Sequence, residues 1–264
     1  NHVRFIGDDA ILRVTADVGP SYIVNEQAFL LDRPVNLFIG TDDSLSQSPD
    51  GLAKHFLHET ECYWTDWVRR LAIPFEWQDA VIRSAITLKM CSYEETGAIV
   101  AALTTSIPEA PRTARNWDYR FCWLRDAYFT VHALNRLSAT RTMEHFVRFM
   151  LDTVVNEGAK DLNPLYPIVS STSVGERNAE SLSGFRDMGP VRIGNAASSQ
   201  QQNDVFGSVI LSAAQLFWDS RVNLVGGKNL YNRLRQVGAM AVERALLPDS
   251  GVWEFRGRAR VHTY

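Results

Sequence analysis

Twelve consecutive residues decide how this chain is interpreted: Arg115-Asn116-Trp117-Asp118-Tyr119-Arg120-Phe121-Cys122-Trp123-Leu124-Arg125-Asp126. They hold two Trp, one Tyr, one Phe, three Arg and two Asp. Aromatic faces suit the C–H patches of a neutral sugar, and an Arg–Asp pair can exchange charge-assisted hydrogen bonds with neighbouring hydroxyls. A buried aromatic cluster with structural ion pairs would have the same composition. Composition alone therefore leaves both interpretations open.

A helix is predicted to begin at the end of this stretch, over residues 124–137. Arg125 and Asp126 would then lie in its first turn, where the helix dipole favours the negative charge of the Asp. Apolar residues at helical spacing predict the other helices of this part of the chain, near 76–93, 141–156, 200–220 and 228–246. The intervening loops 94–123 and 157–199 are long and rich in Pro, Gly, Ser and Thr, which is typical of functional loops.

Before residue 76 the pattern changes from short strands to one helix. β-branched and aromatic runs predict strands at 11–17, 21–25 and 34–39, with Gly19-Pro20 as punctuation between the first two. Ser48 is the predicted N-cap of a helix that continues to Leu71, with Pro49 at its first position.

A second candidate feature lies at Pro248-Asp249-Ser250-Gly251-Val252-Trp253-Glu254-Phe255-Arg256-Gly257. Glu254 stands between two large aromatic residues, and desolvation by aromatic walls favours the neutral carboxyl that a general acid needs. Arg256 would oppose this, because in an extended segment it lies on the same face and stabilises the charged form. A loop Glu paired with Arg256 or Arg258 is the structural alternative, and the sequence does not decide between the two.

The pattern Asn-x-Asp-Tyr-x-aromatic-x-Trp-x-Arg-Asp at 116–126 resembles the sugar-binding signature of glycoside hydrolase family 15, the glucoamylases and their bacterial relatives. Gly-Val-Trp-Glu at 251–254 resembles the general-acid loop of that family. Segments 71–78, 104–109 and 189–192 are also similar, so the resemblance extends over the whole chain.

The resemblance implies a mainly α fold with three parts. Residues 1–47 would be the end of an N-terminal β-sandwich, residues 48–75 a helical linker, and residues 76–264 the first part of an (α/α)6 catalytic barrel with its active site at one mouth. By the same resemblance Glu254 is the general acid that protonates the glycosidic oxygen. The implied substrate-binding residues have distinct tasks: Arg125 and Asp126 hold sugar hydroxyls, Tyr119 lies beneath the oxocarbenium ion, and Trp123 and Trp253 form the pocket walls.

An inverting reaction also needs a carboxylate base across the sugar ring, at about 6.5–9.5 Å from the acid. The family's base lies later in the barrel, so we expect it beyond residue 264. Asn1 is not an initiator Met, and both ends are expected to be trimmed, which leaves the native termini open. We expect the 264 residues alone to be inactive and to associate with copies of themselves through exposed apolar helix faces.

Composition restricts the remaining function classes. A formal net charge of −3 argues against a nucleic-acid partner. The sequence contains no long uninterrupted apolar run, so a membrane partner is not expected either. Three separated cysteines suggest reduced thiols in a cytoplasm. His55 and His58 share a helix face with Glu59 but have no convincing third ligand, so neither a metal nor a cofactor is expected.

Three functions fit the sequence. The first is inverting, exo-acting hydrolysis of α-1,4 or α-1,6 glucosidic bonds, with an oligosaccharide as the small-molecule partner. The second is hydrolysis of the disaccharide trehalose by the same machinery. The third is a non-catalytic carbohydrate-binding or assembly module. The loops of the second sugar subsite separate the first two, and the sequence does not identify them.

Overall fold

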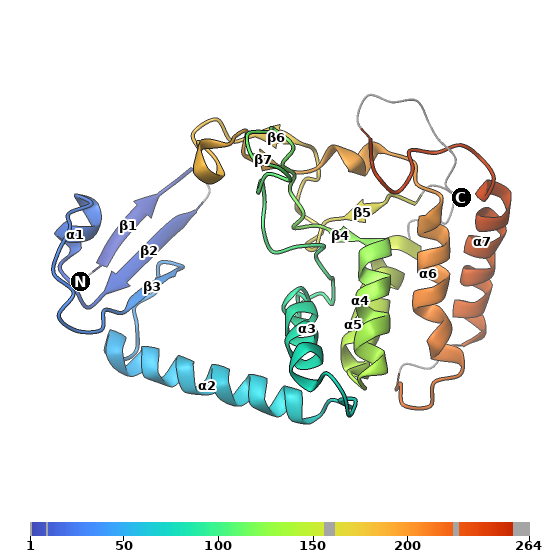
Figure 1. The fold of residues 1–264 in the computed structure, drawn as a ribbon, viewed down its shortest axis with the longest axis horizontal. Coiled ribbons are helices and arrows are strands. Elements are labelled where there is room, and N and C mark those ends of the chain that lie inside the picture. The colour runs from blue at the N-terminus through green and yellow to red at the C-terminus, as the bar shows by residue number, and fades with distance from the viewer. Residues whose placement is uncertain (1, 9, 156–161, 224–226, 256–264) are drawn as a thin grey trace. The chain divides into compact units, whose positions relative to one another are not determined.

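The computed structural model describes residues 2–8, 10–155, 162–223 and 227–255 (Figure 1). The chain forms two compact units, Asn1–Arg69 and Arg70–Tyr264, and is mainly helical. The predicted helical class is therefore confirmed, while the three-part division at residues 47 and 75 stays a prediction.

The first unit contains a three-stranded antiparallel sheet in the order β1-β2-β3. Its strands are β1 (His2–Ile6), β2 (Ile11–Ala16) and β3 (Leu37–Gly40), of which β1 was not predicted. Helix α2 (Pro49–Arg69) follows. The Gly51 N–H donates to Ser48 Oγ over 3.2 Å, which confirms Ser48 as the N-cap.

The predicted strand at 21–25 is wrong, because helix α1 (Pro20–Val24) occupies this segment. Pro20 stands at the first helical position, where its fixed φ suits a helix and its missing N–H costs nothing. The Asn25 N–H donates to the Ser21 carbonyl over 3.0 Å, and the rings of Tyr22 and Phe29 pack at 5.0 Å. Gly19-Pro20 thus begins a helix, and this local signal outweighs the β propensity of the residues that follow.

The second unit is built on helices that are all shorter than predicted and that, with one exception, begin within two residues of the predicted positions. They are α3 (Gln78–Met90), α4 (Leu124–Arg136), α5 (Thr140–Met150), α6 (Asp204–Ala214) and α7 (Lys228–Arg244). A π-helical turn (Leu151–Val155) continues α5, and a 3-10 turn (Gln215–Phe217) continues α6. The exception is α6, which begins four residues later than residue 200 because Gln200–Asn203 make other contacts.

Helix α4 is the centre of the core. It packs against α5 and α6, and α7 packs on the other side of α6 (Figure 1). Its apolar residues recur at helical spacing, so one face is buried: Leu124, Ala127, Val131 and Leu134 are each at most 2% exposed. Burial of each large side chain contributes about 1.5–3 kcal/mol to the free energy of unfolding. The start of α4 is thereby fixed by core packing.

Short strands and turns gather at the end of the helices where α4 and α6 begin (Figure 1). Strand β4 (Cys122–Trp123) pairs with β5 (Leu165–Tyr166), and β6 (Arg177–Asn178) pairs with β7 (Arg192–Ile193). Two 3-10 turns, Phe185–Asp187 and Ala196–Ser199, complete this end. Among the helices of the described ranges, none has both the length and the apolarity that crossing a membrane requires.

Candidate functional site

Two adjoining hollows open at this end of the second unit, of about 400 Å³ and about 310 Å³. The helix-side hollow is the one that also borders Ala101, Trp123, Arg125, Asp126 and Val252. The loop-side hollow is the one that also borders Trp117, Asn195, Ala197 and Gln200. Both are lined by the same six residues: Glu109, Arg115, Tyr119, Trp253, Glu254 and Phe255.

All six residues predicted from the sequence for the site line the helix-side hollow. They are Tyr119, Trp123, Arg125, Asp126, Trp253 and Glu254. The two sequence features, which are about 130 residues apart in the chain, therefore meet in one cavity, as Trp123 and Glu254 illustrate with a sequence separation of 131.

The guanidinium of Arg125 is held in place by the first residue of α6 and by Gln202, which precedes that helix. Its NH1 donates to Asp204 Oδ2 over 3.1 Å and to Gln202 Oε1 over 3.0 Å. Asp126 is the nearer neighbour in sequence but lies farther away, with its Oδ2 3.9 Å from Arg125 Nε. Nearly half of the Asp126 side chain is exposed, so its carboxylate remains accessible to a ligand.

Burial and neighbouring charges alter two acidic groups of the site. Burial raises the pKa of Asp126, and the nearby carboxylates of Glu254 and Asp204 add to the rise, against the lowering effect of Arg125. Burial also raises the pKa of Tyr119 to about 12, with further contributions from Glu109, Glu254 and Asp126. The Tyr119 phenol is therefore neutral throughout the physiological range, and it can donate a hydrogen bond.

The carboxylate of Glu254 is positioned through one of its oxygens. Its Oε1 accepts from Trp123 Nε1 over 2.8 Å and from Gln202 Nε2 over 2.9 Å, and it lies 3.6 Å from Arg125 NH2. Arg256 and Arg258, the alternative partners considered from the sequence, lie outside the described residues. Among the described residues, the carboxylate of Glu254 is thus held by side chains at or before the starts of helices α4 and α6.

A buried carboxylate holds the turn that carries Glu254. Asp249 is fully buried and accepts from the Asn203 N–H over 2.7 Å and from the Gly251 N–H over 2.8 Å. Gly251 and Glu254 both have positive φ, 69° and 54°. Such a φ is uncommon for a residue other than Gly and costs of order 1–3 kcal/mol, so it persists only where the surroundings enforce it.

Part of the motif at 116–126 is structural, as the alternative interpretation holds. Asp118 is fully buried and accepts from Arg120 Nε over 2.8 Å and from the Gly194 N–H over 3.1 Å. A side chain on Gly194 would approach the Gly175 carbonyl oxygen to 2.1 Å, so this contact requires glycine. Asp118 therefore ties the long loops together, whereas Arg125 and Asp126 face the hollow.

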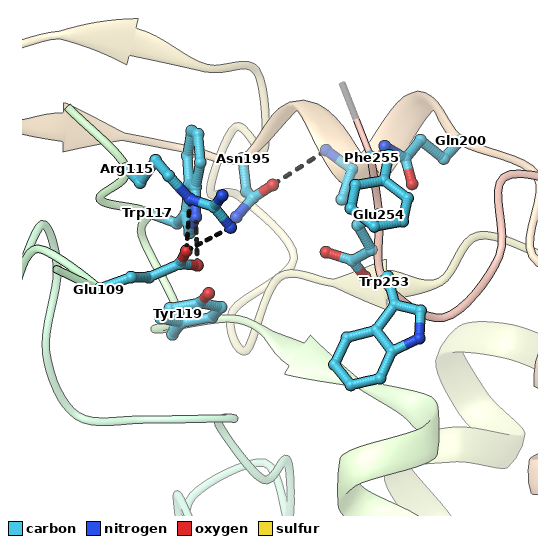
Figure 2. Close-up of a pocket in the computed structure, with 10 residues that line it drawn as sticks. Glu109, Arg115, Trp117, Tyr119, Asn195, Gln200, Trp253, Glu254 and Phe255 are labelled. Atoms are coloured by element: carbon cyan, nitrogen blue, oxygen red, sulfur yellow. Dashed lines mark hydrogen bonds and ion pairs between the residues drawn. The ribbon is translucent and has the colours of Figure 1, made fainter. Parts of the chain in front are cut away.

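The residues of the site that were not predicted include Glu109, Gln202 and Asp249. Glu109 Oε2 accepts from Arg115 Nε over 2.8 Å, and its Oε1 accepts from Trp117 Nε1 over 2.8 Å (Figure 2). Asp249 carries a signal, since Pro-Asp-Ser-Gly is a turn sequence in which an Asp side chain bonds nearby N–H groups. Gln202 and Glu109 carry no such sequence signal, because Gln202 belongs to a run of three Gln at 200–202 and Glu109 lies in a loop.

In the part of the chain that the structure describes, no group of three or more His, Cys, Asp or Glu side chains has an arrangement that could hold a metal ion. His55 and His58 lie on α2 without such a third ligand among the described residues.

Comparison with known proteins gives one family and several relatives. The family model described as "Glycosyl hydrolases family 15" matches residues 77–263. A trehalase of Mycobacterium tuberculosis is 37% identical over 82% of this chain and 32% of its own length. The corresponding values are 34%, 86% and 34% for a trehalase of Mycolicibacterium smegmatis, and 34%, 79% and 32% for one of Thermoplasma volcanium. The chain thus spans about a third of the length of these relatives, and no solved structure matches it significantly.

Proposed function

This chain belongs to the glycosyl hydrolases of family 15, and from that premise we propose that the protein hydrolyses the glucosidic bond of trehalose with Glu254 as general acid. The observation that supports the proposal most is the shared cavity. Glu254 Oε1 lies 3.6 Å from Arg125 NH2, and both residues line the helix-side hollow. An acid and a hydroxyl-binding cation thereby act on one sugar.

The hydrogen bonds of Glu254 assign a task to each of its oxygens. Oε1 already accepts from two N–H groups, of Trp123 and Gln202. An oxygen that accepts two donors has little capacity left for a proton, so the transferable proton belongs on Oε2. That proton passes to the glycosidic oxygen as the C–O bond breaks, which is typically worth about 10²–10⁴-fold in rate.

The helix-side hollow would bind the sugar ring that is attacked. Arg125 and Asp126 hold its hydroxyls, Tyr119 lies beneath the developing positive charge at the anomeric carbon, and Trp123 and Trp253 enclose the ring. Water completes the reaction on the opposite face of the ring and inverts the anomeric carbon. The base that activates this water is proposed to lie in sequence that follows residue 264 in the complete gene product.

The choice of substrate follows the relatives. The curated relatives cited above are named trehalases, which favours trehalose over the α-1,4-linked or α-1,6-linked oligosaccharides of a glucoamylase. The glucoamylase reaction is the second candidate, because the same acid and hydroxyl-binding residues serve both. A non-catalytic carbohydrate-binding module is the third.

Two finer features of the fold belong to the same proposal. We infer that α3–α7 are the beginning of an (α/α)6 barrel, because successive helices alternate in direction and the site lies at one end of them (Figure 1). The sheet β1–β3 would be the end of a β-sandwich. An experimental structure of the complete gene product tests both features.

The test of the function is hydrolysis by the complete gene product and by its Glu254→Gln variant. We expect glucose release from trehalose to exceed that from maltotriose and isomaltose, and Glu254→Gln to reduce kcat by about 10²–10⁴-fold. Early proton NMR spectra should contain β-glucose, since inversion of one α-linked ring produces it.

Sugar binding that persists in Glu254→Ala, together with no hydrolysis by the wild type, would favour the non-catalytic module. Faster release from maltotriose than from trehalose would favour the glucoamylase reaction. If Glu254→Gln retained wild-type kcat, the assignment of the acid would be wrong.

A further inference from the structure

The two hollows meet at Glu254, and this arrangement suits a disaccharide better than a single sugar ring. Glu254 lines both hollows, and so do its neighbours Trp253 and Phe255 and three residues of the facing loop, Glu109, Arg115 and Tyr119. A general acid must contact the oxygen between two sugars, so one sugar lies on each side of it. If the attacked ring occupies the helix-side hollow, the loop-side hollow is the remaining place for the leaving sugar.

A fixed carboxylate faces Glu254 across the loop-side hollow. Figure 2 shows Glu109, Arg115 and Trp117 joined on one side, with Glu254 on the other and one of its carboxylate oxygens directed into the hollow. Glu109 Oε2 lies 2.8 Å from both Nε and NH2 of Arg115, and Oε1 accepts from Trp117 Nε1 over 2.8 Å. About 37% of the Glu109 side chain remains exposed.

This arrangement is suited to hydroxyl recognition. A carboxylate offers about four acceptor sites, and the three nitrogen contacts from Arg115 and Trp117 leave at least one of those of Glu109 for a hydroxyl. Arg115 is 68% exposed and keeps donors for a hydroxyl beside the carboxylate. The pair can therefore accept and donate toward neighbouring hydroxyls, as Arg125 and Asp126 do in the other hollow.

The remaining polar residues of the loop-side hollow have structural contacts of their own. Asn195 Nδ2 donates to the Asp118 carbonyl over 3.1 Å, and its Oδ1 accepts from the Ala197 N–H over 2.9 Å. Gln200 Oε1 accepts from Gln202 Nε2 over 3.2 Å. Glu109 and Arg115 are thus the charged groups that face Glu254 and remain accessible. Both also border the helix-side hollow, but Trp117, which donates to Glu109, lines the loop-side hollow alone.

We propose that the loop-side hollow binds the leaving glucose of the disaccharide, and that Glu109, held by Arg115 and Trp117, is its specificity-determining residue. This inference rests on the proposed function. Glu109 contacts the sugar that departs and takes no part in the chemistry at the attacked anomeric carbon. Its loss should therefore weaken the binding of substrates whose leaving group is a sugar.

The experiment compares trehalose with α-glucosyl fluoride, whose leaving fluoride is too small to reach Glu109. In the complete gene product, Glu109→Gln should raise KM for trehalose about tenfold. Its kcat/KM for trehalose should fall at least fivefold more than its kcat/KM for glucosyl fluoride. Trp117→Phe, which removes one donor to Glu109 and keeps the ring, should change the ratio in the same direction by a smaller factor.

Two further variants serve as references. Glu180→Gln alters an exposed loop carboxylate that lines neither hollow, so both substrates should react as with the wild type. Asp126→Asn alters the helix-side hollow, so both substrates should lose kcat/KM by similar factors. Circular dichroism and the thermal midpoint confirm that each variant is folded.

Equal losses on both substrates in Glu109→Gln would overturn the inference, since a residue that contacts only the leaving sugar cannot affect fluoride departure. A loss of kcat on glucosyl fluoride as large as that of Glu254→Gln would overturn it too, because Glu109 would then act on the attacked ring or its water. A wild type that hydrolyses neither substrate would instead contradict the proposed function.

Discussion

The two halves of the candidate site are held by different means. Arg125 and Asp126 project from the first turn of α4, a helix whose opposite face is buried by Leu124, Ala127 and Val131. Glu254 projects from a turn in which Val252 is 40% exposed and Trp253 is 80% exposed. Core packing fixes the helix-borne half, whereas polar contacts to Asp249, Gln202 and Trp123 fix the turn-borne half.

This difference locates the sensitive part of the site. Core contacts are numerous, and the loss of one leaves the others in place. Hydrogen bonds to a turn are few, and a buried one that is broken leaves an unsatisfied group. Substitutions in the polar contacts should therefore displace Glu254 while α4 keeps its position.

The largest effect is expected from Asp249→Ala. The substitution leaves two N–H groups, those of Asn203 and Gly251, without their acceptor. Each buried unsatisfied group costs about 1–3 kcal/mol, so the free energy of unfolding should fall by about 3 kcal/mol. The turn would no longer hold Glu254, and kcat of the complete gene product should fall about a hundredfold. Urea unfolding and trehalose hydrolysis measure the two losses.

Ser250→Ala is the control for this prediction. Its backbone N–H keeps its bond to the Gln201 carbonyl, so the free energy of unfolding should change by less than about 0.5 kcal/mol. Comparable effects of Asp249→Ala and Ser250→Ala would mean that the buried carboxylate does not hold the turn.

A smaller effect is expected from Gln202→Leu. Gln202 is 1% exposed and connects the two halves, donating to Glu254 Oε1 and accepting from Arg125 NH1. Leu keeps the volume but makes neither bond, while Trp123 Nε1 still donates to Glu254. We expect kcat to fall about tenfold with little change in KM, as for a positioning residue.

The neighbouring Gln201→Leu provides the matched control, since the Gln201 side chain bonds Asn203 and neither half of the site. Gln202→Leu with unchanged kcat, or with kinetic losses no greater than those of Gln201→Leu, would show that the two halves are positioned independently.

The same difference explains what the sequence could predict. Helix α4 follows an apolar spacing that can be read directly, so the place of Arg125 and Asp126 at its first turn was predicted correctly. The resemblance identified Glu254, and the structure brings it to Trp123 and Arg125. The role of each residue in catalysis remains a prediction.

Long-range polar partners could not be predicted in the same way. Gln202 lies in a run of three similar residues, and Glu109 lies in an irregular loop. Their contacts depend on segments that are distant in sequence, as the separation of 52 between Gln202 and Glu254 illustrates. Local propensity also failed at α1, where Pro20 begins a helix among residues that favour strands.

The smallest effect on stability is expected from a substitution in the helix-borne half, Asp126→Asn. Burial, together with Glu254 and Asp204, raises the pKa of Asp126 in the folded protein. The unfolded chain therefore loses this proton at lower pH than the folded one, and the charged Asp126 lowers stability at neutral pH. Asp126→Asn should raise the thermal midpoint of this chain at pH 7, at the expense of hydroxyl binding.

The pH dependence distinguishes this cause from others. As pH falls through the raised pKa of Asp126 the wild type becomes neutral at this position, so the advantage of the Asn variant should shrink and vanish below the ordinary carboxyl value of 3.8.

Asp79→Asn is the matched control, since Asp79 is an exposed residue in the first turn of α3. It loses only the favourable helix-dipole contact of about 0.3–1 kcal/mol, so its thermal midpoint should fall slightly at pH 7. A midpoint for Asp126→Asn that falls as far as that of Asp79→Asn would mean that the charge of Asp126 does not destabilise the folded chain.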